Sequence, residues 1–221
     1  MSLFATLLER FSIARGAATI PGRTALDEVR WVVVDCESSG LDPRADRLLS
    51  IGAVRVGAGR IALDEAFSMV LRQSQASAHD NILVHGIDGT TQLSGSAPAA
   101  VLREFDAFTA TDPLAGFHTP FDQALLERAF REFSGQAWRR PWVDLAQLAP
   151  ALFPALARGR TALDHWLEAF EIDHPARHDA LGDAYATAQL FLVLLAAARA
   201  QRLASVKDLF DVSTAGRWLA H

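Results

Sequence analysis

A chain of 221 residues, half of them hydrophobic, is long enough to bury one sizeable core without disulfides. The formal net charge of −5 argues against a broadly basic surface that binds duplex nucleic acid indiscriminately, although a local basic groove is compatible with it. The single cysteine, Cys36, excludes an intrachain disulfide and favours a reducing, cytoplasmic setting. We find no apolar run approaching the roughly 18 residues that cross a bilayer, so we expect no membrane partner.

Lys207 is the only lysine among the 21 basic residues. Arginine suits bidentate contacts to phosphate groups. A compositional bias of the genome, visible also in the heavy use of alanine and leucine, is the stronger explanation for this preference.

The first 28 residues predict a helical extension followed by a connection. Apolar residues recur at helical spacing behind Ser2, a good N-cap, at Leu3, Phe4, Leu7, Leu8 and Phe11. Residues 16–28, with two glycines and Pro21, indicate a linker into the first strand. We expect the extension to pack on the domain or to contact a partner, residues 29–200 to form that domain, and residues 201–221 to form a helical tail.

Residues 31–37 predict a buried strand that ends in two acids. Trp31 and the three valines after it form an unbroken apolar run, and Asp35 and Glu37 follow. Because side chains alternate along a strand, both carboxylates would project from the same side. They would repel each other by roughly 1 to 4 kcal/mol at about 4 Å, which a divalent metal would offset. Taken alone, two polar residues that open a turn explain the pattern equally well, because residues 38–43 are rich in turn formers.

The middle of the chain predicts two further strands, over residues 48–56 and 60–71, joined by a tight glycine turn. Such a short turn joins antiparallel neighbours, so the chain begins as a three-stranded meander. Residues 73–95 are polar and are predicted to be irregular. Apolar spacing then predicts a helix after Ser96, strands at 113–117 and 142–143, and helices from Thr119, over 145–154, over 161–170, from Asp179 to Leu195, and over 205–210.

Two of these helices begin near further acids. Asp122 lies in the first turn of the helix predicted to have Thr119 as N-cap and Pro120 at its first position. An acid there favourably meets the positive end of the helix dipole, which is a sufficient structural explanation. His178 and Asp183 lie at the start of the last long helix, where a lone histidine is more often a cap or a surface residue.

Three blocks considered together resemble one family. The segments VVVDCESSGLDPRADRLLSIGAVRV, GFHTPFDQALLERAF and HDALGDAYATAQLF, in this order, resemble the DEDDh branch of the 3′–5′ exonucleases, which are DnaQ-like, proofreading-subunit-like enzymes. The resemblance covers about residues 29–197. It implies an α/β fold with a ribonuclease-H-like mixed sheet, in which the antiparallel three-strand meander is extended by parallel strands and flanked by helices. It also implies a hydrolase that releases nucleoside monophosphates.

The same resemblance implies roles for five residues. Asp35 and Glu37 match the acids of the first motif, Asp122 matches the second and Asp183 the third. Together they would hold two Mg²⁺ ions, with Mn²⁺ as the alternative, because oxygen ligands suit both metals and two metals can stabilise the attacking and the leaving oxygen. His178, five residues before Asp183, would take the proton of the attacking water.

Contacts to the terminal nucleotide are expected at six positions, namely Ser38, Gly40, Leu41, His85, Phe117 and His118. The family's second motif commonly reads Gly-His-Asn, whereas here Gly116 is followed by Phe117 and His118, so these contacts are expected to differ. A loop stabilised by His85 is an equally good explanation of that residue. Asp144, which follows a predicted strand, is expected to act at most as a supporting acid.

The expected substrate is the 3′ end of single-stranded DNA. An exoribonuclease or oligonucleotide trimmer is the alternative within the class, because the backbone chemistry is shared. A catalytically idle, polymerase-associated nucleic-acid-binding module is the alternative from another class. The four acids and the histidine disfavour this second alternative, because in an idle site the carboxylates would repel one another and no activity would offset that cost. The expected partners are single-stranded DNA or RNA 3′ ends and a polymerase or another replication or repair protein.

Overall fold

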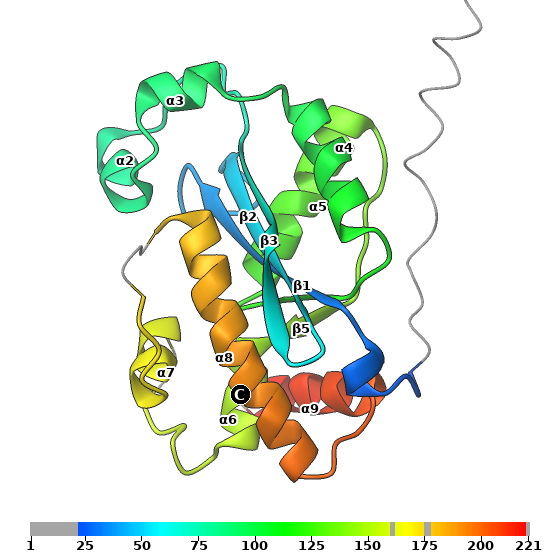
Figure 1. The fold of residues 1–221 in the computed structure, drawn as a ribbon. Coiled ribbons are helices and arrows are strands. Elements are labelled where there is room, and N and C mark those ends of the chain that lie inside the picture. The colour runs from blue at the N-terminus through cyan, green and yellow to red at the C-terminus, as the bar shows by residue number, and fades with distance from the viewer. Residues whose placement is uncertain (1–21, 160–161, 175–177, 220–221) are drawn as a thin grey trace, which may run out of the picture.

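A computed structural model describes residues 22–159, 162–174 and 178–219 (Figure 1). Its centre is a five-stranded mixed sheet in the order β3-β2-β1-β4-β5, with helices on both faces. The α/β, ribonuclease-H-like class predicted from the motifs is confirmed. The predicted N-terminal helix and Thr161, the first residue of the helix predicted over 161–170, lie outside the described residues.

The antiparallel half of the sheet is the predicted meander. It consists of β1 (Trp31–Ser38), β2 (Leu48–Gly57) and β3 (Arg60–Val70), each hydrogen-bonded to the next. The β2–β3 turn has positive φ at Ala58 (50°) and Gly59 (73°), as expected of a tight hairpin turn. The parallel half follows on the other side of β1, with β4 (Leu114–Gly116) beside β1 and β5 (Trp142–Asp144) beside β4.

Alternate side chains of β1 enter two separate cores. Trp31 and Val33 pack in the core beneath α8 (Ala180–Ala200), which also includes α6 (Leu145–Leu152) and α7 (Leu163–Ala169). Val32 and Val34 pack in the core beneath α4 (Pro98–Thr109) and α5 (Pro120–Ser134). The end of β1 therefore presents its side chains alternately to α8 and to α5.

The start of α8 lies unusually close to β2. A Cβ atom on Gly52 would fall 2.1 Å from the carbonyl carbon of Ala180, so this approach requires a glycine. Asp179 caps the helix, since its side chain accepts a hydrogen bond of 2.9 Å from the Gly182 N–H. Together these features place the first turn of α8 over the sheet beside the end of β1.

By length and composition α8 could cross a membrane, whereas no segment long and apolar enough to do so was expected from the sequence. More than half of its most apolar window, 56%, is nevertheless buried inside the fold. It packs against β1 and β2 on one side and α6 on another, so its apolar residues extend around most of the helix. We interpret α8 as the central core helix, and its hydropathy as a consequence of that position.

Four local expectations differ from the structure. Residues 73–95 contain α2 (His79–His85) and α3 (Gly89–Ser94), two helices too short to show a periodic pattern. Thr119 has helical backbone angles and a buried hydroxyl without a hydrogen-bond partner among the described residues, so it does not cap α5. The residue at the N-cap of α7 is Ala162. The last helix, α9 (Val206–Leu219), runs further than the predicted 205–210 and packs on α6 and β5.

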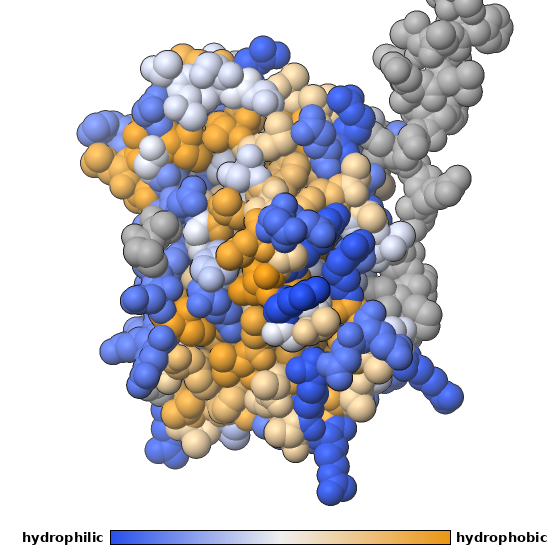
Figure 2. Space-filling view, viewed as in Figure 1, coloured by the Kyte–Doolittle hydropathy of each residue, from blue (hydrophilic) through white to orange (hydrophobic). Residues whose placement is uncertain are grey.

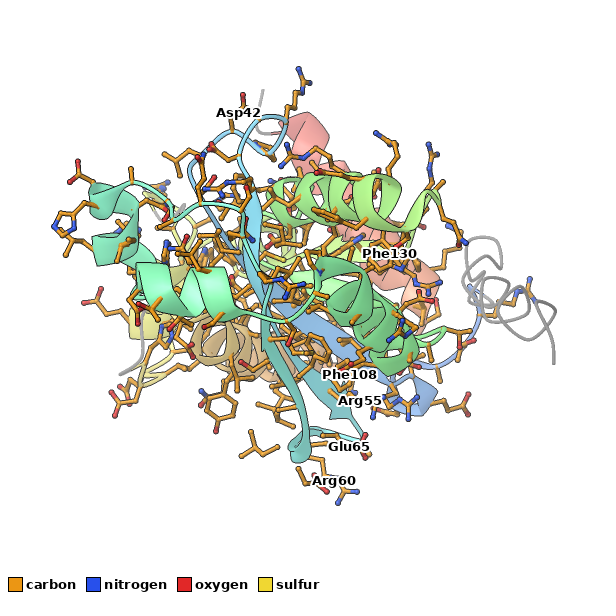
Figure 3. All side chains as sticks on the ribbon, turned by 90° about the horizontal axis from the view of Figure 1, so that it is seen from above. Asp42, Arg55, Arg60, Glu65, Phe108 and Phe130 are labelled. Carbon is orange, nitrogen blue, oxygen red and sulfur yellow. The ribbon has the colours of Figure 1, made fainter. Side chains whose placement is uncertain are left out.

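The two ends of the meander differ in character. A short 3₁₀ helix, η2 (Leu26–Glu28), precedes β1. At the hairpin end Arg55 lies over the Phe108 ring, 4.4 Å from its centroid, and forms an ion pair with Glu65 (Figure 3). At the opposite end the α2–α3 segment carries exposed apolar side chains, among them Leu83 at 70% exposure, and Figure 2 shows a hydrophobic patch over α2.

Candidate active site

Three of the expected acids meet at the end of β1. Asp35 and Glu37 project from the face of β1 that α8 covers, and the first turn of α8 supplies Asp183. One carboxylate oxygen from each residue lies within 4.8 Å of the other two. Asp35 and Glu37 are half-buried, and Asp183 is buried with 5% exposure. We call Asp35, Glu37 and Asp183 the acid cluster.

The donor set of the acid cluster suits a hard divalent cation. Carboxylate oxygens are the ligands that Mg²⁺ and Mn²⁺ prefer, whereas soft cations favour thiolates. A spacing below 4.8 Å between the oxygens allows one cation to contact all three residues. The acid cluster therefore fits the metal that the motifs imply.

Two histidines contact the Asp183 carboxylate, one through its backbone N–H and the other through its ring. The backbone N–H of His178 donates a hydrogen bond of 2.9 Å to Oδ2 of Asp183, while the His178 ring is exposed. His178 has a φ of 60°, a left-handed conformation that is uncommon outside glycine. On the other carboxylate oxygen, Nε2 of His174 lies 3.1 Å from Oδ1, and both side chains are less than a tenth exposed.

His174 was missed by the sequence reasoning. The only local signal is a second histidine four residues before His178, in a segment without a periodic pattern. The tertiary structure brings its ring, from the described segment after α7, to Asp183 in the first turn of α8. A histidine beside a carboxylate can orient it or exchange a proton nearby.

Asp122 lies on the other face of β1. Cys36, between Asp35 and Glu37, points toward α5, and both its thiol and its backbone N–H form hydrogen bonds with the Asp122 carboxylate. Burial raises the pKa of Asp122 to about 7, and these hydrogen bonds oppose the rise. Burial and the surrounding carboxylates raise the pKa of the Cys36 thiol well above its usual value. The structure therefore places Asp122 at the same strand end as the acid cluster but not within it.

Asp144 supports the segment that leads to Asp122. Its Oδ1 accepts hydrogen bonds from the N–H groups of His118 at 3.0 Å and Ala146 at 3.1 Å, which links this segment to the start of α6. Burial raises the pKa of Asp144. His118 is exposed with a φ of 58°, and its ring meets the Phe117 ring edge to face at 4.9 Å. The two aromatic rings expected to contact substrate thus lie beside each other.

The loop after β1 is held in one shape by its own side chains. Ser39 Oγ donates to Asp46 at 3.1 Å and accepts from the Arg47 N–H at 2.9 Å. A Cβ atom on Gly40 would fall 2.4 Å from Asp46 Oδ2, so the tight approach favours glycine. Leu41, in this loop, is 93% exposed. Ser38 is buried, and its hydroxyl donates to the Gly40 carbonyl.

Both ring nitrogens of His85 form hydrogen bonds with neighbouring residues of the fold. Its Nε2 lies 2.8 Å from Asn81 Oδ1, and its Nδ1 accepts from the Ile87 N–H at 2.9 Å. Asn81 in turn donates to the Ser38 carbonyl at 3.0 Å, which ties α2 to the end of β1. Burial lowers the pKa of the His85 ring. The loop-stabilising explanation accounts for all of these contacts.

Comparisons with known proteins agree with this geometry. A family model described as "Exonuclease" matches residues 32–191. A DNA polymerase III subunit epsilon-like protein of Rhodobacter capsulatus is 34% identical over 86% of this chain, and the DNA polymerase III subunit epsilon of Aquifex aeolicus is 27% identical over 75% of the chain and 80% of its own length. Crystalline E. coli exonuclease I in complex with a dT13 oligonucleotide has a TM-score of 0.66 at 18% identity, over 79% of this chain and 42% of that one.

The chain therefore belongs to the exonuclease family. By class it is an exonuclease domain, and the resemblance to the DEDDh, proofreading-subunit-like enzymes is confirmed. The chain spans 27% of the length of the Rhodobacter relative and 12% of a DNA polymerase III PolC-type protein of Thermotoga maritima.

Proposed function

We propose that this domain removes nucleotides from the 3′ end of single-stranded DNA and releases nucleoside monophosphates. The observation that carries the proposal is the acid cluster, in which two acids of β1 and one of α8 bring their oxygens within 4.8 Å of one another. The chain's net charge of −5 favours a single strand over a long duplex, which would need many phosphate contacts. The names of the polymerase III relatives and the oligonucleotide bound to exonuclease I support this substrate class.

We assign the four acids to two Mg²⁺ ions. Asp35, Glu37 and Asp183 would hold one ion, and Asp122 would join in holding the second. Two such ions stabilise the charge on the attacking and leaving oxygens. Asp122 would bind as a carboxylate, because a nearby cation favours the charged form and opposes the effect of burial on its pKa.

His178 is the proposed general base, which takes the proton of the attacking water. Its exposed ring has access to water, and its backbone N–H holds Asp183 in place. His174 is the rival, because its ring is already 3.1 Å from Asp183. A buried ring in contact with a proposed metal ligand is better suited to orienting that ligand than to meeting substrate.

The wider assignment is also a proposal. It comprises an exonuclease domain at residues 29–200 with a helical extension before it and a helical tail after it. It further comprises a cytoplasmic setting and a polymerase or other replication or repair protein as partner. The relatives' names and the single cysteine support the setting and the partner. Matched labelled DNA and RNA oligomers, incubated with Mg²⁺ and with a chelator, test the substrate. Faster degradation of RNA would replace the proposal with the exoribonuclease alternative.

The base assignment is tested by comparing His178→Ala with His174→Ala. We expect His178→Ala to lower kcat by about 10² to 10⁴, the usual contribution of a general base, with unchanged Mg²⁺ dependence. The acidic limb of its pH–rate profile should lose its inflection. Recovery of wild-type turnover at saturating Mg²⁺ would instead make His178 a metal ligand. Near-normal turnover in His178→Ala, with a large loss in His174→Ala, would transfer the role to His174.

A further inference from the structure

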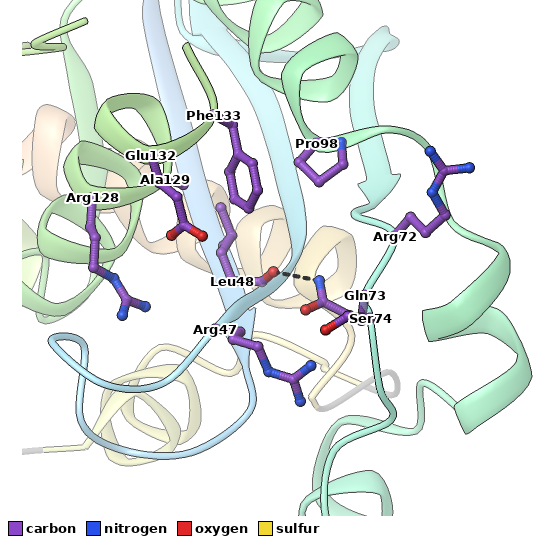
Figure 4. Close-up of a pocket in the computed structure, with 10 residues that line it drawn as sticks. All are labelled: Arg47, Leu48, Arg72, Gln73, Ser74, Pro98, Arg128, Ala129, Glu132 and Phe133. Atoms are coloured by element: carbon purple, nitrogen blue, oxygen red, sulfur yellow. Dashed lines mark hydrogen bonds between the residues drawn. The ribbon is translucent and has the colours of Figure 1, made fainter. Parts of the chain in front are cut away.

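A second concave site lies near the end of β1, on the α5 face of the sheet. It has a volume of about 420 Å³ and lies between the start of β2, the segment after β3, the start of α4 and the second half of α5 (Figure 4). We call it the arginine pocket, because Arg47, Arg72 and Arg128 surround it. Leu48, Pro98 and Phe133 add apolar surface, and the Phe133 side chain points into the pocket in Figure 4.

Two of the three guanidinium groups are positioned by hydrogen bonds, and none of the three is neutralised by an ion pair within the described residues. Arg47 Nη1 donates to the Gln75 carbonyl at 2.6 Å, and Arg128 Nη1 donates to the Arg44 carbonyl at 2.8 Å. Within the described part of the chain, none of the three arginines forms an ion pair with a carboxylate, although Glu132 also lines the pocket. Carbonyl oxygens orient a guanidinium group while leaving its positive charge available to an anion.

The pocket lies one strand away from the end of β1 that carries the acids. Leu48, which lines the pocket, is paired in the sheet with Ser38, the residue after Glu37. Neighbouring strands lie about 4.8 Å apart, so a chain ending at the acid cluster need only cross the end of the sheet to reach the pocket. Phe133, with 43% exposure, offers a ring surface there.

Two other described segments are linked to the acid cluster or to the end of β1, one through His174 on Asp183 and one through Asn81 on Ser38, and both lack basic charge apart from histidine. Residues 162–174 include four acids and no arginine or lysine. Residues 79–94, in α2 and α3, include Asp80 and Asp88 and likewise no arginine or lysine. A polyanion leaving the acid cluster therefore meets attractive charge on the α5 face and repulsive charge on these two flanks.

We propose that the arginine pocket binds the substrate strand just upstream of its 3′-terminal nucleotides, with arginine side chains on its phosphates and Phe133 stacked on a base. The guanidinium fork matches phosphate geometry, and an aromatic ring stacks on any base without sequence preference. The volume of the pocket is in the range of small-ligand sites, enough for about one nucleotide. The inference rests on the proposed exonuclease function, which supplies the strand.

Arg72→Glu is the most informative variant, because the Arg72 guanidinium has no hydrogen bond or ion pair among the described residues and its replacement leaves the loops anchored. We would measure fluorescence anisotropy of 5′-labelled single-stranded DNA in the presence of a chelator. Dodecamer affinity should fall about tenfold or more, as for a lost hydrogen bond to a charged group. The slope of log K against the logarithm of salt concentration should become shallower by about 0.7 for each phosphate contact that is lost. Trinucleotide affinity should not change.

Two further variants are needed. One tests the contribution of base stacking, and the other tests whether the effect of a charge change depends on its position. Phe133→Ala should weaken dodecamer binding about fivefold or more without changing the salt dependence, because stacking carries no counterion release. Arg60→Glu makes the same charge change at the β2–β3 hairpin, which Figure 3 shows at the opposite end of the sheet from Asp42 of the loop after β1. It should bind both oligonucleotides as the wild type does.

Several results would overturn the proposal. These are unchanged dodecamer binding in Arg72→Glu, an equal loss for the trinucleotide and the dodecamer, or an equal loss in Arg60→Glu. An acidic, phenylalanine-containing peptide that binds through Arg72 while dodecamer binding ignores Arg72 would assign the pocket to a protein partner. Hydrolysis with Mg²⁺ is measured separately. A wild-type protein that binds the dodecamer through Arg72 but hydrolyses nothing would refute the exonuclease proposal and leave the pocket assignment standing.

Discussion

The two faces of β1 at its end hold acids in contrasting environments. On the α8 face Asp35 and Glu37 are half-buried and share the acid cluster with Asp183. On the α5 face Asp122 is buried against Cys36, and burial raises its pKa to about 7. The alternation of side chains along one strand produces both environments within three residues. A cation at the acid cluster meets preassembled oxygens, whereas a cation at Asp122 must also favour loss of a proton.

Among the changes to these acids, the largest expected effect concerns the α8 face. Asp183→Asn keeps an oxygen that can accept the His178 N–H but removes the charge, so kcat should fall by about 10² to 10³, as when one electrostatic contact to a transition state is lost. Asp179→Asn is the matched control, since it changes an acid in the same segment and asparagine caps a helix as well as aspartate. Steady-state kinetics on a labelled oligonucleotide measure both. An equal loss in the two variants would trace the effect to the helix start.

The next effect is a pH dependence of the free energy of unfolding, which Asp122 on the α5 face causes. The pKa of Asp122 is raised from 3.8 to about 7 by burial, so the folded protein binds a proton that the unfolded chain releases. The stability it contributes is fully present below pH 3.8 and is lost as pH rises through about 7. Without metal, the free energy of unfolding should fall over this range by an amount on the order of a few kcal/mol. Denaturant titrations in chelator at several pH values measure it.

Asp122→Asn should flatten this dependence, because an amide does not titrate. Asp64→Asn, which removes an exposed acid from β3, is the control for the loss of one charge and should keep the dependence. A slope equally steep in Asp122→Asn would locate the titrating group elsewhere and remove the contrast between the two faces.

The smallest effect is the stabilisation by cation. At a hundredfold excess over Kd, one bound Mg²⁺ should raise the free energy of unfolding by about 2.7 kcal/mol. Calorimetric titration should find two ions in the wild type and one in Asp122→Asn, which keeps the acid cluster, whereas Asp183→Asn should lose the ion held there. If Asp122→Asn bound no ion at all, Asp122 would belong to the cluster and the two faces would act as one site.

Patterns that span a few neighbouring residues were readable before the structure. The apolar run ending in Asp35 and Glu37 has the period of a strand, and that period alone places both acids on one side. Asp179 caps α8 and thereby places Asp183 in its first turn. The meander followed from a short turn between two strands. In each case the chemistry that decides the outcome acts over a few bonds.

Short or aperiodic features could not be read in this way. The helices α2 and α3 are too short for periodicity to separate them from a loop, and they are stabilised by side-chain contacts such as that of His85 with Asn81. Thr119 has the composition of a cap, but its backbone is already helical there. Local propensity is a weak prior that packing overrides.

What the sequence by itself determined is the family, the mixed sheet and the three motifs that carry Asp35, Glu37, Asp122 and Asp183. The tertiary structure alone decided which acids share one cation-sized cluster, that His174 rather than the His178 ring contacts Asp183, and that Arg47, Arg72 and Arg128 enclose one pocket. Strand alternation and helix capping depend on adjacent residues, so they are written along the chain. Burial, pKa shifts and pockets depend on segments far apart in the sequence that packing brings together, so no local pattern encodes them.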